Sequence, residues 1–91
     1  MTTIQSFTTE IEIDGGLFAF EVDFEAEVYV EQDVNYREVI FFSFVVDNVF
    51  EYDENNQPKL IPYGSDRFWD ILSDDVLGLL KEEAESICLD Q

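Results

Sequence analysis

The side chains of this chain that could do chemistry are almost all carboxylates. Of its 91 residues, 22 are Asp or Glu, none is His, and Cys88 is the single cysteine. The usual catalytic nucleophiles need a nearby base, and Cys88 has neither an imidazole nor a cationic side chain close to it in the sequence. Paired carboxylates hydrolyse glycosides only in a cleft that raises the pKa of one acid, which a display of solvated acids does not provide. We therefore expect no enzyme activity and interpret Cys88 as a core residue.

Hard oxygen ligands for a metal gather in one stretch of the chain. They are Asp47, Asn48, Asp53, Glu54 and Asn55. The stretch lacks the alternating spacing, the central Gly and the terminal Glu of a calcium loop. A solvated turn is favoured over a metal site, so we expect neither a metal nor a cofactor.

The net charge of −18 is the strongest signal in the composition, because only four cations stand against the acids. Solubility of a small domain needs a net charge of only about 2 to 8. A surface of this sign repels nucleic acid and anionic lipid, and it attracts basic protein surfaces with an advantage that fades as salt rises. We therefore expect a basic protein as the partner, with no direct binding to nucleic acid or to membranes.

The N-terminal residues 1–6 lack the basic start and the apolar run of a signal peptide. No apolar segment approaches the length that spans a membrane. Cys88 has no partner for an intrachain disulfide, which agrees with a reducing compartment. These features favour a cytoplasmic location.

Hydrophobic residues make up 46% of the chain and aromatic residues 15%, which is enough apolar surface to fold one domain despite the charge. The period of the apolar residues is that of strands first and of helices last. We expect a single α+β domain over residues 1–91. Residues 1–61 form an antiparallel β-meander of three to four strands, and residues 65–89 form a C-terminal helical segment packed on one sheet face.

The clearest expected element is a strand over Leu17–Glu31, in which apolar residues alternate with acids. One of its faces belongs to the core and the other is almost entirely acidic. Gln5–Ile13 has the same period and forms the strand before it. Asp14-Gly15-Gly16 lies between the two and supplies the conformations that a tight hairpin turn needs.

The register of this hairpin follows from the choice of turn residues. With Gly15-Gly16 as the two-residue turn, Ile13 lies opposite Phe18 and the apolar faces of both strands coincide. The same register places Glu10 directly opposite Glu21, and such like-charge pairs destabilise a sheet.

A third strand is expected over Glu38–Tyr52, after a polar loop at residues 32–37. Residues 39–46 are apolar at both odd and even positions, which is typical of a strand covered on both faces. If the helix covers only one face, then a set of apolar residues is exposed on the other face and marks an interface. A homodimer is the most economical explanation of such an interface. The alternative is that the segment of Phe68 and Trp69 covers this set. The two alternative sets are Val39, Phe41 and Val45, or Ile40, Phe42, Phe44 and Val46. A short edge strand, Lys59–Ile61, follows between two prolines.

Two serines are expected to cap helices. Ser65 begins a short helical turn that contains Phe68 and Trp69, and Ser73 begins a second helix with Asp74 and Asp75 in its first turn. The second helix has one apolar face. Its members are Val76, Leu77, Leu80, Ala84, Ile87 and Cys88.

The candidate binding site is the set of acids that these elements display. Alternate strand residues are about 6.6 Å apart, a spacing not far from that of phosphates along a nucleic-acid strand. A plain solvent-exposed sheet face usually mixes Lys, Arg, Thr and Glu, but the second strand has no Lys or Arg. The candidate partner-binding residues are Glu10, Glu12, Glu21, Asp23, Glu25, Glu27, Glu31, Asp74, Asp75 and Glu82.

The run from Glu21 to Glu27, the helix acids and the overall charge resemble the small acidic phage-encoded proteins that mimic DNA. Those proteins block host nucleases, restriction enzymes or CRISPR effectors. The resemblance implies a stoichiometric inhibitor of a basic nucleic-acid-binding protein, acting in the bacterial host cytoplasm if the chain is phage-encoded. The alternative is a protein-interaction or assembly module, such as a phage accessory protein, that docks through the apolar face of the third strand.

Overall fold

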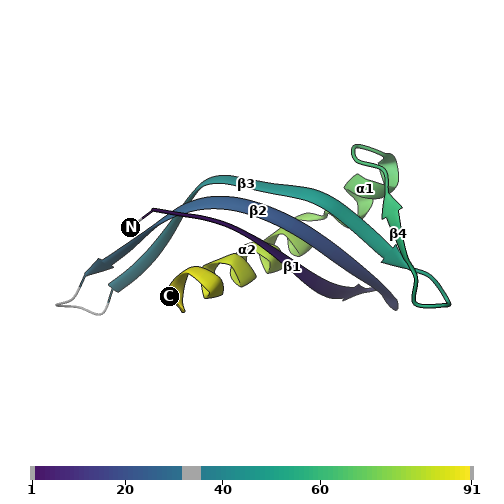
Figure 1. Ribbon diagram of the computed structural model, residues 1–91, viewed down its shortest axis with the longest axis horizontal. Coiled ribbons are helices and arrows are strands. Elements are labelled where there is room, and N and C mark those ends of the chain that lie inside the picture. Colours follow the sequence, from purple (N-terminus) through teal and green to yellow (C-terminus); the bar gives the residue numbers. More distant parts are fainter. Residues whose placement is uncertain (1, 32–35, 91) are drawn as a thin grey trace.

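The fold is a four-stranded antiparallel sheet followed by two helices, shown by a computed structural model that describes residues 2–31 and 36–90 (Figure 1). The sheet order is β1-β2-β3-β4. The elements are β1 (Thr2–Ile13), β2 (Gly16–Glu31), β3 (Tyr36–Tyr52), β4 (Pro58–Ile61), α1 (Asp66–Ile71) and α2 (Asp74–Leu89). The predicted α+β class, with a meander before a helical segment, is confirmed. Residues 32–35 of the predicted polar loop lie outside the described residues, and β3 already begins at Tyr36.

The molecule is long and narrow, with extents of 51 × 22 × 20 Å. The sheet arches along its length, and α2 lies under its concave side (Figure 1). None of the helices among the described residues is long and apolar enough to cross a membrane.

The core forms where the apolar side of β2 meets the apolar face of α2. Even-numbered β2 residues from Phe18 to Val28 are buried, as the period-two pattern predicts. Phe20 and Leu80 belong to one buried cluster and are both 0% exposed. A second cluster joins Phe24, Ala26 and Val28 to Ala84 and Cys88, which confirms that Cys88 is a buried residue.

The register of the first hairpin differs from the prediction by two residues. Asp14 and Gly15 have φ of 51° and 84°, so they form the two-residue turn and Gly16 pairs with Ile13. Asp-Gly suits such a turn because Asp tolerates the left-handed region and Gly enters it without cost. A shift of two keeps the apolar faces together, but Glu10 now faces Ala19. The predicted apposition of Glu10 and Glu21 is therefore wrong.

Strand β3 carries two register shifts against β2, and they explain its unusual pattern. Asp47 is skipped between the pairs Glu21–Asn48 and Val22–Val46. Phe42 is skipped in the same way farther along the strand. Each such bulge moves the following residues to the other face. The side turned toward α2 is therefore formed by Val39, Phe41, Phe44, Val46 and Val49.

This arrangement corrects the expectation that β3 is covered on both faces. On the side away from α2, Ile40, Phe42 and Val45 remain 39%, 58% and 44% exposed. The exposed set therefore matches neither of the two predicted alternatives, because the bulges take members from both. Phe68 packs in the core cluster, and the neighbouring Trp69 is 56% exposed.

The C-terminal third begins with the short edge strand that was predicted. β4 pairs with β3 only at Val49–Tyr52. Both predicted caps are present: the Ser65 hydroxyl accepts the Phe68 N–H at 3.2 Å, and the Ser73 hydroxyl accepts the Val76 N–H at 3.3 Å. These caps fix where α1 and α2 start.

The observed register predicts which cysteine pair forms a disulfide across the first hairpin. Thr8 and Glu21 face each other, and they are a non-hydrogen-bonded pair with Cα atoms about 4.5 Å apart, within disulfide range. Thr8→Cys with Glu21→Cys should therefore oxidise readily, as counted by the loss of free thiols in denaturant. Glu10→Cys with Glu21→Cys is the matched control, since diagonal residues lie about 7–8 Å apart, too far for an unstrained bridge. Oxidation of the control alone would contradict the register.

Candidate protein-binding surface

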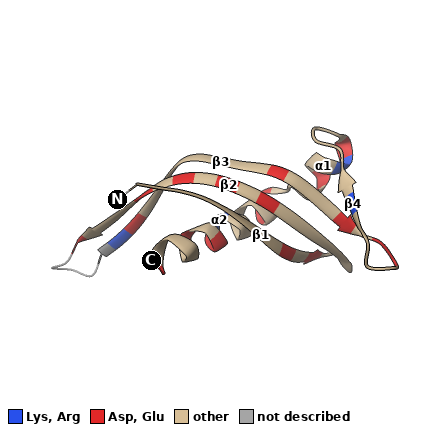
Figure 2. Cartoon of the chain, viewed as in Figure 1, with Lys and Arg blue, Asp and Glu red and all other residues tan. Residues whose placement is uncertain are grey.

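We define the convex face as the side of the sheet that points away from α2. Its central feature is the acidic row, formed by Glu21, Asp23, Glu25 and Glu27 of β2. These residues are exposed or half-buried and alternate with the buried residues of the same strand. Figure 2 shows the resulting succession of acidic positions along β2. The row is one-sided because the pleat sends every second side chain to the same face.

The strand beside the row is uncharged over most of its length. Thr8, Ser6 and Ile4 lie opposite Glu21, Asp23 and Glu25. Glu10 and Glu12 lie opposite Ala19 and Leu17, so they continue the row toward the turn. Glu10 and Glu12 of the predicted site therefore extend the acidic row at one end and do not form a second row beside it.

The four cations of the chain do not neutralise the acidic row. Arg67 donates to Glu51 at 3.0 Å, and Lys59 lies 3.9 Å from Asp53 at the same end of the sheet. Arg37 donates to the backbone oxygen of Leu89, and Lys81 lies over the ring of Phe44 on the α2 side. The blue positions that can be seen in Figure 2 lie at the start of β3 and, at the other end of the molecule, on β4 and α1. The convex face thus keeps its negative charge.

Neutral hydroxyl groups hold several of these carboxylates instead. The Ser6 hydroxyl donates to Asp23 and the Tyr52 hydroxyl donates to Glu10 at 3.2 Å. Hydrogen bonding to Glu27 raises the pKa of Tyr29, and hydrogen bonding to Glu10 raises that of Tyr52. Such bonds orient a carboxylate without cancelling its charge.

Two acids on this face are in contact, Asp23 of the acidic row and Asp47, the residue at the bulge of β3. Their side-chain hydrogen bond lowers the pKa of Asp23 and raises the pKa of Asp47. Ser6 lowers the pKa of Asp23 further, while burial and the charges of Asp23 and Glu21 raise that of Asp47. The pair therefore holds one proton more readily than two separate solvated acids would.

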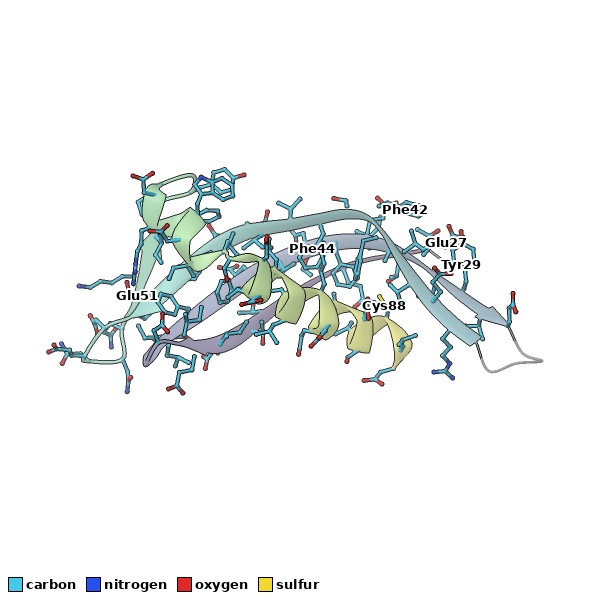
Figure 3. All side chains as sticks on the ribbon, turned by 180° about the vertical axis from the view of Figure 1, so that it is seen from behind. Glu27, Tyr29, Phe42, Phe44, Glu51 and Cys88 are labelled. Atoms are coloured by element: carbon cyan, nitrogen blue, oxygen red, sulfur yellow. The ribbon has the colours of Figure 1, made fainter. Side chains whose placement is uncertain are left out.

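Apolar side chains of β3 flank the acidic row on its other side. Ile40 pairs with Glu27 and Val45 pairs with Asp23. Phe42 projects on the convex side near Glu27, whereas Phe44 points toward α2 (Figure 3). We call Ile40, Phe42 and Val45 the apolar flank. A row of anions beside an exposed aromatic ring is a combination that suits a protein partner.

The structure separates the acids that the sequence grouped into one site. Glu31 ends β2 and is exposed there. Asp74, Asp75 and Glu82 are exposed on α2, on the other side of the sheet from the acidic row. They therefore do not share a surface with Glu21–Glu27.

The sequence pattern indicated Asp47 only as a possible metal ligand and did not place it beside the acidic row, and it did not predict which residues form the apolar flank. The residues of β3 that pair with the buried residues of β2 switch from odd to even positions across Phe42 and back to odd across Asp47. The sequence shows this only as apolar residues at both odd and even positions. The possible metal ligands between Asp47 and Asn55 do not come together in one site. The Asp53 side chain accepts the N–H groups of Asn55 and Gln57, as in a plain turn. Within residues 2–31 and 36–90, no three Asp, Glu or Cys side chains are placed to hold a metal ion.

Comparison with family models, curated proteins and solved structures finds no match to this chain.

The Asp23–Asp47 contact predicts a pH-dependent gain in stability for Asp47→Asn. Because the folded-state pKa of Asp47 is raised, its contribution to stability is present below its unfolded pKa and is lost as the pH rises through the folded value. The Asn amide keeps a donor for Asp23 at every pH. The variant should therefore melt higher than the parent near neutral pH, and the difference should shrink toward about pH 4.

Glu54→Gln is the control for this experiment, since it removes one negative charge from the exposed turn after β3. Melting temperatures measured from about pH 4 to about pH 7 should show a smaller gain for this variant. An equal gain would mean that only the net charge matters and that the contact between the two aspartates does not.

Proposed function

We propose that this protein is an acidic binding protein that occupies the cationic groove of a nucleic-acid-binding protein and inhibits it stoichiometrically. The observation that carries the proposal is the acidic row on a convex face where the described residues place no Lys or Arg. Carboxylates there take the place of phosphates against the Lys and Arg side chains of the partner. Targets of this kind include host nucleases, restriction enzymes and CRISPR effectors.

The linear charge density supports the proposal. One strand of DNA carries one phosphate per about 3.4 Å, so a length equal to that of this molecule, 51 Å, carries roughly 15 phosphates. The chain has a net charge of −18, which exceeds that of one such strand and falls below the roughly 30 of a duplex. A groove that binds phosphates would therefore meet a comparable density of charge.

The shape of the molecule and the hydroxyl contacts of its carboxylates also support the proposal. A convex surface enters a concave groove, and the cross-section of 22 × 20 Å is similar to that of a nucleic-acid duplex. The contacts of Ser6 and Tyr52 hold Asp23 and Glu10 in place before a partner binds. Such preorganisation lowers the entropy that binding costs.

The experiment is capture of partners from a bacterial lysate by the immobilised protein, with and without nuclease treatment and at two salt concentrations. We expect capture of a basic nucleic-acid-binding protein that persists after nuclease treatment, weakens steeply with salt and is displaced by DNA or RNA. Glu21→Lys with Glu25→Lys should reduce capture by an order of magnitude or more.

The matched control is Glu85→Lys with Asp90→Lys, which changes the net charge equally at exposed positions of α2 and its C-terminal end. Capture of the partner by this control variant should fall only by the part of the attraction that depends on the total charge of the protein. Equal loss in both variants would contradict docking through the acidic row, and capture that competitor DNA does not affect would contradict phosphate mimicry.

The apolar flank favours a second candidate function, a protein-interaction or assembly module that docks through Ile40, Phe42 and Val45, including docking of a second copy. In that case complex formation is nearly insensitive to salt. Phe42→Glu should abolish it while the fold persists, because the Phe42 side chain is 58% exposed. Phe41 is unsuitable for this test, since it packs against the buried Phe24 cluster.

A further inference from the structure

Strand β1 has an open edge along its whole length. β2 is its only strand neighbour in the part of the chain that the structure describes. Sheets usually blunt such an edge with Pro, Lys, a bulge or a very short strand. β1 has 12 residues that pair with β2 without interruption, and it contains no Pro, Lys or Arg. From Thr2 to Thr9 it contains no charge at all.

By comparison, the opposite edge of the sheet is protected against pairing with another strand. β4 covers β3 at Val49–Tyr52, and the bulges at Phe42 and Asp47 interrupt the regular spacing of its backbone groups. A bulged edge pairs poorly with another strand. If a strand adds to this sheet, β1 is therefore the edge that receives it.

The turn geometry tells which backbone groups of β1 are available. In a two-residue hairpin the flanking residues, here Ile13 and Gly16, exchange both backbone hydrogen bonds. Bonded and non-bonded residues then alternate along β1, so the N–H and C=O groups of Ser6, Thr8 and Glu10 point to the open edge. These groups form one half of a regular antiparallel or parallel ladder.

An acidic hollow of about 320 Å³ adjoins this edge where β1 meets α2. Glu82 and Glu83 of α2 line it together with Glu10, and Ile11 and Leu79 supply its apolar part. Such a lining suits a Lys or Arg side chain, whose stem packs on apolar groups while its head reaches carboxylates. The side chains of an added strand alternate in direction, so every second one would point toward α2.

We infer that the β1 edge binds an extended, cationic segment of a partner protein by strand addition, with a Lys or Arg side chain in the hollow beside α2. Backbone hydrogen bonds supply affinity in this mode and the hollow supplies selectivity. A second copy of the chain is a poor occupant, because it would bring another charge of −18 and a second set of α2 acids to the same edge. Glu10 lies at the end of the acidic row and also lines this hollow, but the other groups of this contact are separate from the convex face, and the inference does not depend on the function proposed for that face.

The probe is a peptide of about ten residues in which Lys and Val alternate. Binding should slow hydrogen exchange at the amides of Ser6, Thr8 and Glu10, observed by NMR, because these amides point to the open edge. Thr8→Pro removes one outward N–H and leaves the ladder with β2 unchanged, so it should weaken peptide binding by about tenfold, with Thr8→Val as the control. Glu82→Gln with Glu83→Gln should weaken binding by about threefold or more.

A second form of the peptide keeps the test decisive if Thr8→Pro perturbs the fold. The same peptide with every second backbone nitrogen methylated has the same charge but cannot complete a ladder, so it should fail to protect the three amides. Glu21→Lys with Glu25→Lys should leave their protection in place, which separates this contact from the convex face.

Three results would overturn the inference. The first is peptide binding without protection of the β1 amides, and the second is equal binding by the methylated peptide. The third is protection of Ser6, Thr8 and Glu10 in the free protein that increases with its concentration, since a second copy would then occupy the edge.

Discussion

The packing of β2 against α2 is the constraint on which the other features depend. Phe20, Val22 and Leu80 are almost completely shielded from water in one cluster, and burying side chains of this size stabilises a fold by about 1.5–3 kcal/mol each. Because successive strand residues alternate in direction, burial of the even-numbered residues sends the odd-numbered acids outward. A slip of one residue in the strand register would bury Glu21, Asp23 and Glu25. Burying a carboxylate that has no charged or hydrogen-bonding partner costs a large amount of free energy. The apolar core therefore fixes where the negative charge lies.

The charge itself works against folding. A net charge of −18 repels itself in a molecule only 22 × 20 Å in cross-section, and the ion pairs of Arg67 and Lys59 relieve this only at one end of the sheet. The Asp23–Asp47 contact adds a local cost on the convex face. Local costs of this kind concentrate where a protein binds something. A basic partner would relieve both the overall repulsion and this contact, which supports the function proposed for the acidic row.

Local patterns in the sequence predicted the strands and helices, but they did not predict the register in which the strands pair. The alternation of β2 and the serine caps at Ser65 and Ser73 depend on neighbouring residues, so the strands, the helices and the buried faces of β2 and α2 followed from the sequence. The hairpin register did not, because Asp14-Gly15 and Gly15-Gly16 both satisfy a tight turn and both keep the apolar faces together. The bulges at Phe42 and Asp47 exist only relative to β2, and they made the one-sided β3 resemble a strand covered on both faces. The α2 acids were included in the predicted site because they add to the negative charge, although a helix that covers the apolar side of the sheet places them on the other side from the acidic row.

The central claim is that the position of the charge matters more than its amount. The most direct measurement compares two variants that each lose four negative charges, using the affinity for the captured basic partner over a series of salt concentrations. One variant changes Glu21, Asp23, Glu25 and Glu27 to their amides, and the other changes Asp70, Asp75, Glu85 and Asp90. We predict that only the first loses most of its affinity and most of the slope of log affinity against log salt. Parallel losses in the two variants would contradict the account, because binding would then depend on total charge alone.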